Sequence, residues 1–206
     1  VAKSALGQGT SDSIGQGIYI VDAESGALVF SASPAKATTI NKEVAEMSYS
    51  MPGSVALLDG DVDGRTDRIY ATDTGGNIWR MDLKGADKSK WSIFKFAAIG
   101  NSYLADADKT LVNDRRLFTQ PVLVRTINKG WSYSNNQYAY NERPFDAVII
   151  GTGDRNRPSS ESTAKNVYVM LRDYNVKPTL FGVDPDASIP APITLDDLYD
   201  VTADPF

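Results

Sequence analysis

One layout occurs three times in this chain: a strand of alternating apolar and polar residues, an aspartate, a turn containing glycine, and a second strand. Alternation with a period of two is typical of a β-strand with one buried face. Ile18 and Ile69 hold corresponding places in the first two units and lie 69 − 18 = 51 residues apart. That distance is close to the ~40–50-residue period of propeller blades. The three units occupy residues 17–30, 68–82 and 146–172.

This layout predicts antiparallel hairpins joined by tight turns. Its repetition favours an all-β fold, a partial and modified β-propeller of antiparallel blades with long irregular loops. Ordinary hairpins of a β-sandwich would also fit the alternation. We expect the chain to be one fragment, residues 1–206, of a single propeller domain without an internal boundary, because a piece of this length cannot close a full propeller.

The segments between and after the repeats predict further elements. Residues 117–125 read as a strand, and residues 131–140 as a loop rich in aromatic and amide side chains, which a decorated hairpin insertion would explain equally well. Residues 159–165 read as a polar loop and residues 184–192 as irregular. Residues 194–199 predict a short helix with Thr194 as its N-cap.

Composition limits the chemistry available to the chain. The 206 residues carry a net charge of −5 and contain neither cysteine nor histidine. The negative charge argues against a non-specific nucleic-acid surface. Without cysteine there are no disulfides or thiolate metal sites, and without histidine the commonest general base and transition-metal ligand are absent. A bound metal must therefore be held by oxygen, which favours Ca²⁺ or Mg²⁺.

The motif that carries chemistry lies in residues 59–67, between two predicted strands. Aspartate occupies positions 1, 3, 5 and 9 of this segment, and Gly64 stands at position 6. In a curled loop alternate side chains can converge, and the glycine permits the reversal that returns the last aspartate to the group. Position 7 offers a backbone carbonyl. The predicted calcium ligands are Asp59, Asp61, Asp63, the carbonyl oxygen of Arg65, and Asp67.

Four carboxylates and one carbonyl, completed by water, would supply the six to eight oxygen ligands that Ca²⁺ prefers. Without a cation these carboxylates would repel one another. A solvated acidic turn is the simpler alternative, but such a turn needs only one or two aspartates. The loop is not an EF-hand, because Tyr70 stands at position 12, where that motif has a bidentate glutamate. It instead resembles the hairpin calcium loops of integrin α-subunit propellers.

The wider context of this loop resembles a known family. Residues 49–53, 55–58 and 68–83, together with the loop, are similar to the C-terminal β-propeller of the PilC/PilY family of type IV pilus tip-associated adhesins and pilus biogenesis factors. Residues 148–154, 167–173 and 195–202 resemble the same family less closely. The resemblance implies the same calcium ligands, with Asp63 at a position where some members have asparagine.

The resemblance also implies a role and a location. Calcium occupancy would regulate pilus extension against retraction, twitching motility and surface attachment. The expected partners are pilus components such as minor pilins, and ligands on host cells or abiotic surfaces. The expected location is the bacterial cell surface at the pilus tip, reached through the periplasm and outer membrane. The family further implies propeller sequence after Phe206 and a separate region before Val1.

Two other functions remain open at this point. Residues 22–26 resemble the repeat of quinone-dependent alcohol dehydrogenases, which are propeller enzymes. Their sites often use a vicinal cysteine pair and a free catalytic aspartate beside calcium, which this chain does not offer, so we expect no enzymatic activity. An integrin-like calcium-binding interaction propeller outside the pilus system is the other alternative.

Three tryptophans raise the question of a carbohydrate- or surface-binding patch. Trp79 lies in a predicted blade strand, so a core position is much the stronger expectation for it. Trp131 lies near Tyr133, Tyr138 and Tyr140 in the aromatic segment, where adhesion and simple decoration of a hairpin are equally good explanations.

Overall fold

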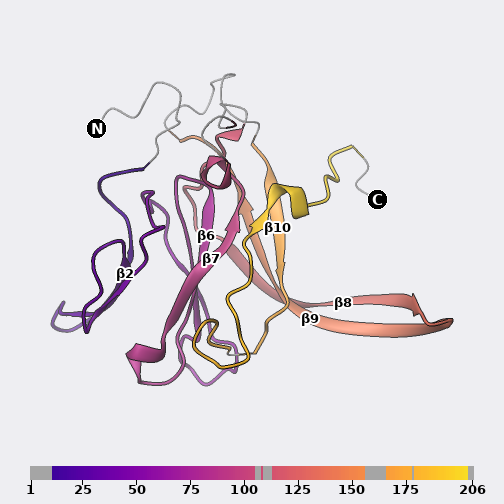
Figure 1. Cartoon of the computed structure of the whole chain (residues 1–206), viewed down its shortest axis with the longest axis horizontal. Coiled ribbons are helices and arrows are strands. Elements are labelled where there is room, and N and C mark those ends of the chain that lie inside the picture. Colours follow the sequence, from indigo (N-terminus) through magenta and orange to yellow (C-terminus); the bar gives the residue numbers. More distant parts are fainter. Residues whose placement is uncertain (1–10, 105–107, 109–112, 156–165, 178, 204–206) are drawn as a thin grey trace.

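The computed structural model of the chain describes residues 11–104, 108, 113–155, 166–177 and 179–203. The predicted polar loop at 159–165 lies entirely outside these residues. The described residues form three separate β-sheets, which follow one another from left to right in Figure 1. The expectation of an all-β, partial propeller-like architecture is confirmed.

The N-terminal sheet contains β1 (Ile18–Val21), β2 (Leu28–Ser33) and β3 (Asn41–Glu43). The central sheet has the order β11-β7-β6-β5-β4. Its strands are β4 (Ala56–Leu58), β5 (Arg68–Thr72), β6 (Asn77–Asp82), β7 (Ser92–Ala98) and β11 (Ile193–Thr194). The third sheet contains β8 (Val122–Ser134), β9 (Gln137–Gly151) and β10 (Tyr168–Asp173). Short 3₁₀ helices occupy Lys88–Lys90, Asn101–Tyr103 and Leu195–Asp197.

Each predicted repeat is an antiparallel hairpin. The pairs are β1 with β2, β5 with β6, and β9 with β10. The blades are not antiparallel throughout, however, because β2 pairs in parallel with β3 and β11 in parallel with β7. The strand β11 returns to β7 from far along the chain, which allows either direction. The three-residue strand β3 follows β2 after only residues 34–40.

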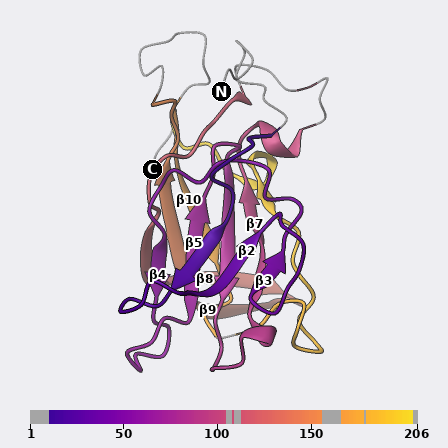
Figure 2. The ribbon, with the colours of Figure 1, turned by 90° about the vertical axis from the view of Figure 1, so that its left-hand side faces the viewer.

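The middle strands of the central sheet, β5, β6 and β7, are buried on both faces, and this explains their composition. All residues of β5 and β6 are buried. Ile69, Trp79 and Met81 point to a core shared with the N-terminal sheet. Tyr70, Ile78 and Phe94 point to the opposite core, shared with β9 and β10. The same alternation that would give a half-exposed strand therefore supplies side chains to two cores. Figure 2 shows the N-terminal sheet in front of the central sheet.

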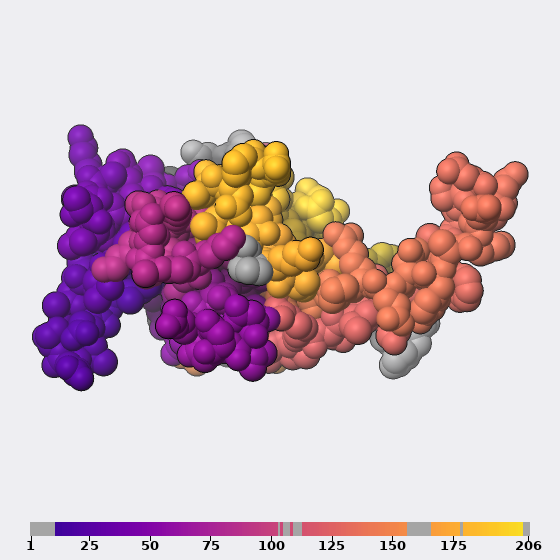
Figure 3. All heavy atoms as spheres, turned by 90° about the horizontal axis from the view of Figure 1, so that it is seen from below, coloured from indigo at the N-terminus to yellow at the C-terminus, as the bar shows by residue number. Residues whose placement is uncertain are grey.

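The structure corrects two predictions between the repeats. The strand expected at 117–125 begins at Val122, directly after Pro121, which has no N–H to donate to a ladder. Residues 131–140 are not a loop: they form the far end of the β8–β9 hairpin, a long two-stranded ribbon that projects from the body (Figures 1 and 3). Asn135 and Asn136 turn the chain with φ of 52° and 59°, as a type I′ turn requires. The aromatic segment is thus a hairpin, and a role of its exposed side chains in adhesion stays a prediction.

Two C-terminal expectations are confirmed. Residues 184–192 contain no regular element. The short helix is present as Leu195–Asp197, shorter than predicted, with Thr194 at its N-cap. The Asp197 carboxylate accepts hydrogen bonds from the Thr194 N–H at 2.8 Å and hydroxyl at 3.0 Å. Among the described residues, no helix has the length and apolar character needed to cross a membrane.

The tryptophans do not share a surface. Trp79 is 1% exposed, and its indole N–H donates to the Asp73 carboxylate at 2.8 Å. Trp91 packs edge-on against Phe30. Trp131 is 72% exposed and pairs with Tyr140 across the ribbon, next to the pair of Tyr133 and Tyr138. The core position of Trp79 is confirmed, and the aromatic residues of the ribbon lie on one face of it.

Candidate metal centre

The predicted calcium loop connects two strands of the central sheet. Residues 59–67 run from the end of β4 to the start of β5, which pair antiparallel. The Asp67 N–H donates to the Leu58 carbonyl at 2.9 Å, and the Leu83 N–H donates to the Asp67 carbonyl at 2.7 Å. The backbone of Asp67, the last aspartate of the loop, is thus fixed by hydrogen bonds to Leu58 and to Leu83.

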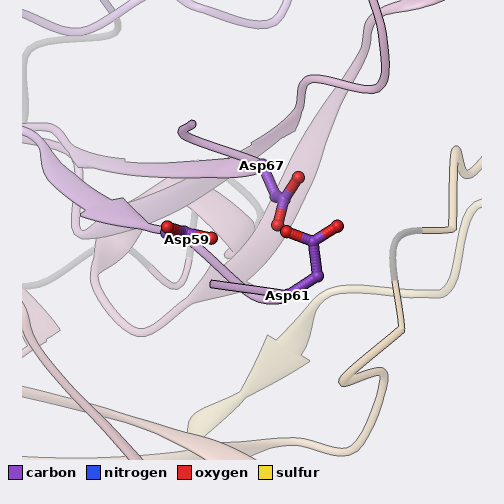
Figure 4. Close-up of side chains that lie close together, drawn as sticks. All are labelled: Asp59, Asp61 and Asp67. Atoms are coloured by element: carbon purple, nitrogen blue, oxygen red, sulfur yellow. The ribbon is translucent and has the colours of Figure 1, made fainter. Parts of the chain in front are cut away.

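Three of the four carboxylates that were predicted as ligands lie close together in the structure. One oxygen each from Asp59, Asp61 and Asp67 lies within 4.8 Å of the other two. Figure 4 shows the carboxylates of Asp61 and Asp67 turned toward one another, with Asp59 beside them. Asp59 and Asp61 are exposed and Asp67 is half-buried, so the group lies at the surface, open to solvent.

Backbone amides hold the first aspartate in place. Asp59 Oδ1 accepts from the Val62 N–H at 2.7 Å and the Asp63 N–H at 3.2 Å, while Oδ2 accepts from the Gly64 N–H at 2.9 Å. This curl requires positive φ at Val62 (64°) and Gly64 (86°). Gly64 adopts that conformation freely, as the sequence suggested, whereas Val62 must be held there by the surrounding hydrogen bonds.

Gly60 allows the two ends of the loop to approach. Its N–H donates to Asp67 Oδ2 at 2.7 Å. A Cβ at this position would lie 3.1 Å from the same oxygen, closer than side chains normally tolerate. Gly64 contacts the group at Asp59, as its place in the motif suggested, and Gly60, which the motif did not single out, contacts it at Asp67.

Asp63 and Arg65 have a different role in this conformation. Asp63 is not one of the three converging residues; its Oδ1 accepts from the Arg65 N–H at 2.8 Å. Asp63 therefore stays a predicted ligand that lies outside the converging group, and the Arg65 carbonyl stays a predicted ligand.

The converging residues suit a hard cation. Ligand oxygens lie about 2.3–2.6 Å from Ca²⁺, so two of them on one ion are at most about 5 Å apart. The three carboxylate oxygens meet that limit. Each carboxylate oxygen has two lone pairs, so the backbone N–H groups that bind Asp59 and Asp67 leave capacity for a metal. The donor set fits Ca²⁺, and solvent can complete its shell.

A residue that the sequence analysis missed contacts the loop from the third sheet. Arg125 of β8 donates through Nη1 to the Gly60 carbonyl at 2.6 Å. Its Nε and Nη2 donate to Asp146 of β9 at 2.8 and 3.1 Å, and this hydrogen bonding raises the pKa of Arg125. Asp146 is the residue directly opposite Arg125 in the β8–β9 ladder. The local sequence gives no signal for this contact, since its partners lie far apart in the chain.

Asp146 belongs to a buried network of charges between the central and third sheets. Arg68 donates to Asp82 at 2.9 Å and to Asp146 at 3.2 Å. Arg80 donates to Asp82 at 2.9 Å and to Asp173 at 2.6 Å. Burial would lower the pKa of Arg68, but the acidic groups around it reverse this and raise it. Burial raises the pKa of Asp82 against the opposing effect of Arg80 and Arg68.

With Arg125 included, three arginines face three aspartates in this network, so its formal charge balances. The side chains of Arg68, Arg80, Asp82, Asp146 and Asp173 are each at most 5% exposed. Tyr70 adds a hydroxyl that donates to Asp173 at 2.6 Å. A buried pair of this kind is costly to break from one side, because the partner then stays charged without compensation.

Comparison with known proteins places this geometry in context. No family model matches the chain. A curated protein of Xylella fastidiosa (strain Temecula1), described as a type IV pilus biogenesis factor PilY1 homolog, is 40% identical over 57 residues. The chain is related to the PilY1 family. The similarity covers 28% of this chain and 4% of that PilY1 homolog, so the chain spans only a small part of the relative's length.

A solved structure is also similar. The crystal structure of the Pseudomonas aeruginosa PilY1 C-terminal domain aligns with a TM-score of 0.47 and 19% identity. The alignment covers 80% of this chain and 32% of the PilY1 domain.

Proposed function

We propose that this chain is a calcium-binding β-propeller portion of a type IV pilus-associated protein of the PilY1 kind. The convergence of Asp59, Asp61 and Asp67 in a surface loop carries the proposal of calcium. The curated relative's description as a pilus biogenesis factor supports the proposal of the pilus. Asp63 and the Arg65 carbonyl join the shell when the ion binds, by rotation of residues at the exposed tip of the loop.

In this proposal calcium acts as a regulator. Occupancy of the loop biases pilus extension against retraction, and with it twitching motility and surface attachment. The partners are pilus components, minor pilins among them, and ligands on host cells or abiotic surfaces. The protein acts at the cell surface, at or near the pilus tip. These roles rest on the resemblance of the chain to the family and on the relative's description.

Calcium is expected to stabilise the folded chain. The ion binds converged carboxylates that the unfolded chain does not assemble, so a free concentration ~1,000 times the dissociation constant adds about 4 kcal/mol. In a domain of this size each kcal/mol raises Tm by roughly 2–4 °C. Melting scans in calcium and in chelator, with titration calorimetry, measure both effects. Equal melting temperatures without binding heat would refute the proposed site.

Magnesium is the control ion for that experiment. It prefers a strict octahedral shell at shorter distances and gives up water reluctantly. We expect Mg²⁺ at the same concentration to shift Tm much less than Ca²⁺. An equal shift would mean that the loop is a general divalent site.

We propose further that the chain has no enzymatic activity. The absence of histidine and cysteine, and the engagement of the acidic loop with a metal, support this. Dye reduction by the calcium-loaded chain supplied with a quinone cofactor would favour the quinoprotein alternative instead. No observation favours an integrin-like role outside the pilus system.

A further inference from the structure

We propose that Arg125 is a positioning residue of the calcium loop: it fixes the Gly60 peptide so that the aspartates on either side of it face Asp67. The proposal rests on the function proposed above. It adds a residue that orients the site from a different sheet, near the start of β8 in the long β8–β9 ribbon.

Both polar groups of the Gly60 backbone are held by hydrogen bonds. Its N–H donates to Asp67 Oδ2, and its carbonyl accepts from Arg125 Nη1. Asp59 and Asp61 are the neighbours of Gly60 in the chain. Fixing both polar groups of Gly60 therefore sets how far these two carboxylates lie from Asp67. Without the second contact, the peptide that joins Gly60 to Asp61 loses the hydrogen bond that orients its carbonyl.

Arg125 can perform this role because it is itself fixed. Its Nε and Nη2 donate to the two oxygens of Asp146, whose side chain is 1% exposed. Asp146 in turn accepts from the buried Arg68. The planar guanidinium fork reaches the carboxylate and the loop carbonyl at once, which a lysine ammonium cannot do with the same geometry.

The positive charge of Arg125 and its hydrogen bond to the loop predict opposite effects on calcium affinity. A measured change in affinity therefore separates the two effects. A cation beside a calcium site weakens binding by repulsion, so a purely electrostatic Arg125 would lower calcium affinity. A positioning Arg125 raises it. Asp146 offsets the positive charge, so the geometric effect dominates. Partners outside the ligand shell that orient ligands typically contribute 10- to 100-fold in metal affinity.

The test is calcium titration calorimetry on the chain and on R125M and R125K. We expect R125M to bind calcium roughly 10- to 100-fold more weakly, and R125K to lie between R125M and the unchanged chain. Lysine keeps the charge but contacts either Asp146 or the Gly60 carbonyl. The matched control is R143M, on the same ribbon, where Arg143 stacks on Tyr174 instead. That control should leave calcium affinity unchanged.

Melting in chelator separates positioning from general destabilisation. R125K retains a charge opposite Asp146, so its metal-free Tm should stay near that of the unchanged chain while its calcium affinity falls. Tighter calcium binding by R125M, with R125K unchanged, would reduce Arg125 to a charge effect and overturn the proposal. If the unchanged chain binds calcium and both variants bind it equally well, only this inference fails. If the unchanged chain binds none, the proposed function fails.

Discussion

D67N is expected to weaken calcium binding by at least about 100-fold. It should also lower Tm in calcium but not in chelator. Loss of partners outside the ligand shell already costs about 10- to 100-fold in metal affinity, and Asp67 is a charged member of the converging group. Asparagine keeps an oxygen that can accept the Gly60 N–H, so the shape of the loop is preserved. The variant removes charge and little else.

The reversal follows from repulsion among the carboxylates. In chelator, removal of one of three close negative charges relieves repulsion, so D67N should melt at the same temperature as the unchanged chain or higher. In calcium the unchanged chain gains binding free energy that D67N lacks, and D67N should melt lower. D59A is expected to weaken binding as severely, and it also loses the oxygens that accept from Val62, Asp63 and Gly64.

Two controls accompany these variants. T66A changes a residue of the same loop that is not a predicted ligand, and D196A removes an exposed aspartate far from it in sequence. Both should bind calcium like the unchanged chain. If D196A weakened binding as much as D67N, the effect would come from net charge, and the loop would not be the calcium-binding site.

D173N is expected to lower the free energy of unfolding by about 3–5 kcal/mol, the range measured when one partner of a buried ion pair is removed. Asp173 accepts from Arg80 and from the Tyr70 hydroxyl, each at 2.6 Å, and Arg68 lies 3.6 Å away. The amide has nearly the same shape, so the loss reports the uncompensated charge of the arginines. Urea denaturation, with the slope m compared between variants, measures it.

The matched control is an ion pair on the exposed ribbon. Lys129 and Glu142 lie 3.1 Å apart with side chains 55% and 48% exposed. E142Q should change stability by less than about 1 kcal/mol, because solvent screens such pairs. Y70F removes the hydroxyl that donates to Asp173 and accepts from Arg68, and it should give an intermediate loss of about 1–2 kcal/mol. A D173N variant as stable as E142Q would mean that the network does not hold the two sheets together.

The hairpins and the acidic loop could be predicted from sequence because both depend on local order. Alternation within a strand and the spacing of aspartates in one loop are properties of neighbouring residues. The converging group of Asp59, Asp61 and Asp67 followed from that spacing. The spacing did not predict that Asp63 accepts a hydrogen bond from the Arg65 N–H. Several aspartates of the loop compete for the same backbone amides, and spacing does not show which one binds which amide.

The buried charges could not be predicted in the same way. Arg68, Arg80 and Asp82 alternate with apolar residues in β5 and β6, and that pattern is also typical of a solvent-exposed face. Only the packing of β9 and β10 over that face shows that the charges are enclosed. The contact of Arg125 with the loop could not be predicted from sequence for the same reason. Its partners, Gly60 and Asp146, come together only after two sheets have assembled.

The double burial of the central sheet sets the order in which the molecule can open. Amide protons of β5 and β6 can exchange with solvent only after both neighbouring sheets have moved away, so their protection should approach the free energy of complete unfolding. The strands β1 and β3 are edges of the outer N-terminal sheet, and β1 contributes to one core alone. They should exchange through smaller, local openings. The fold thus has a slow-exchanging middle and a faster N-terminal flank, with the calcium loop attached to the slow part.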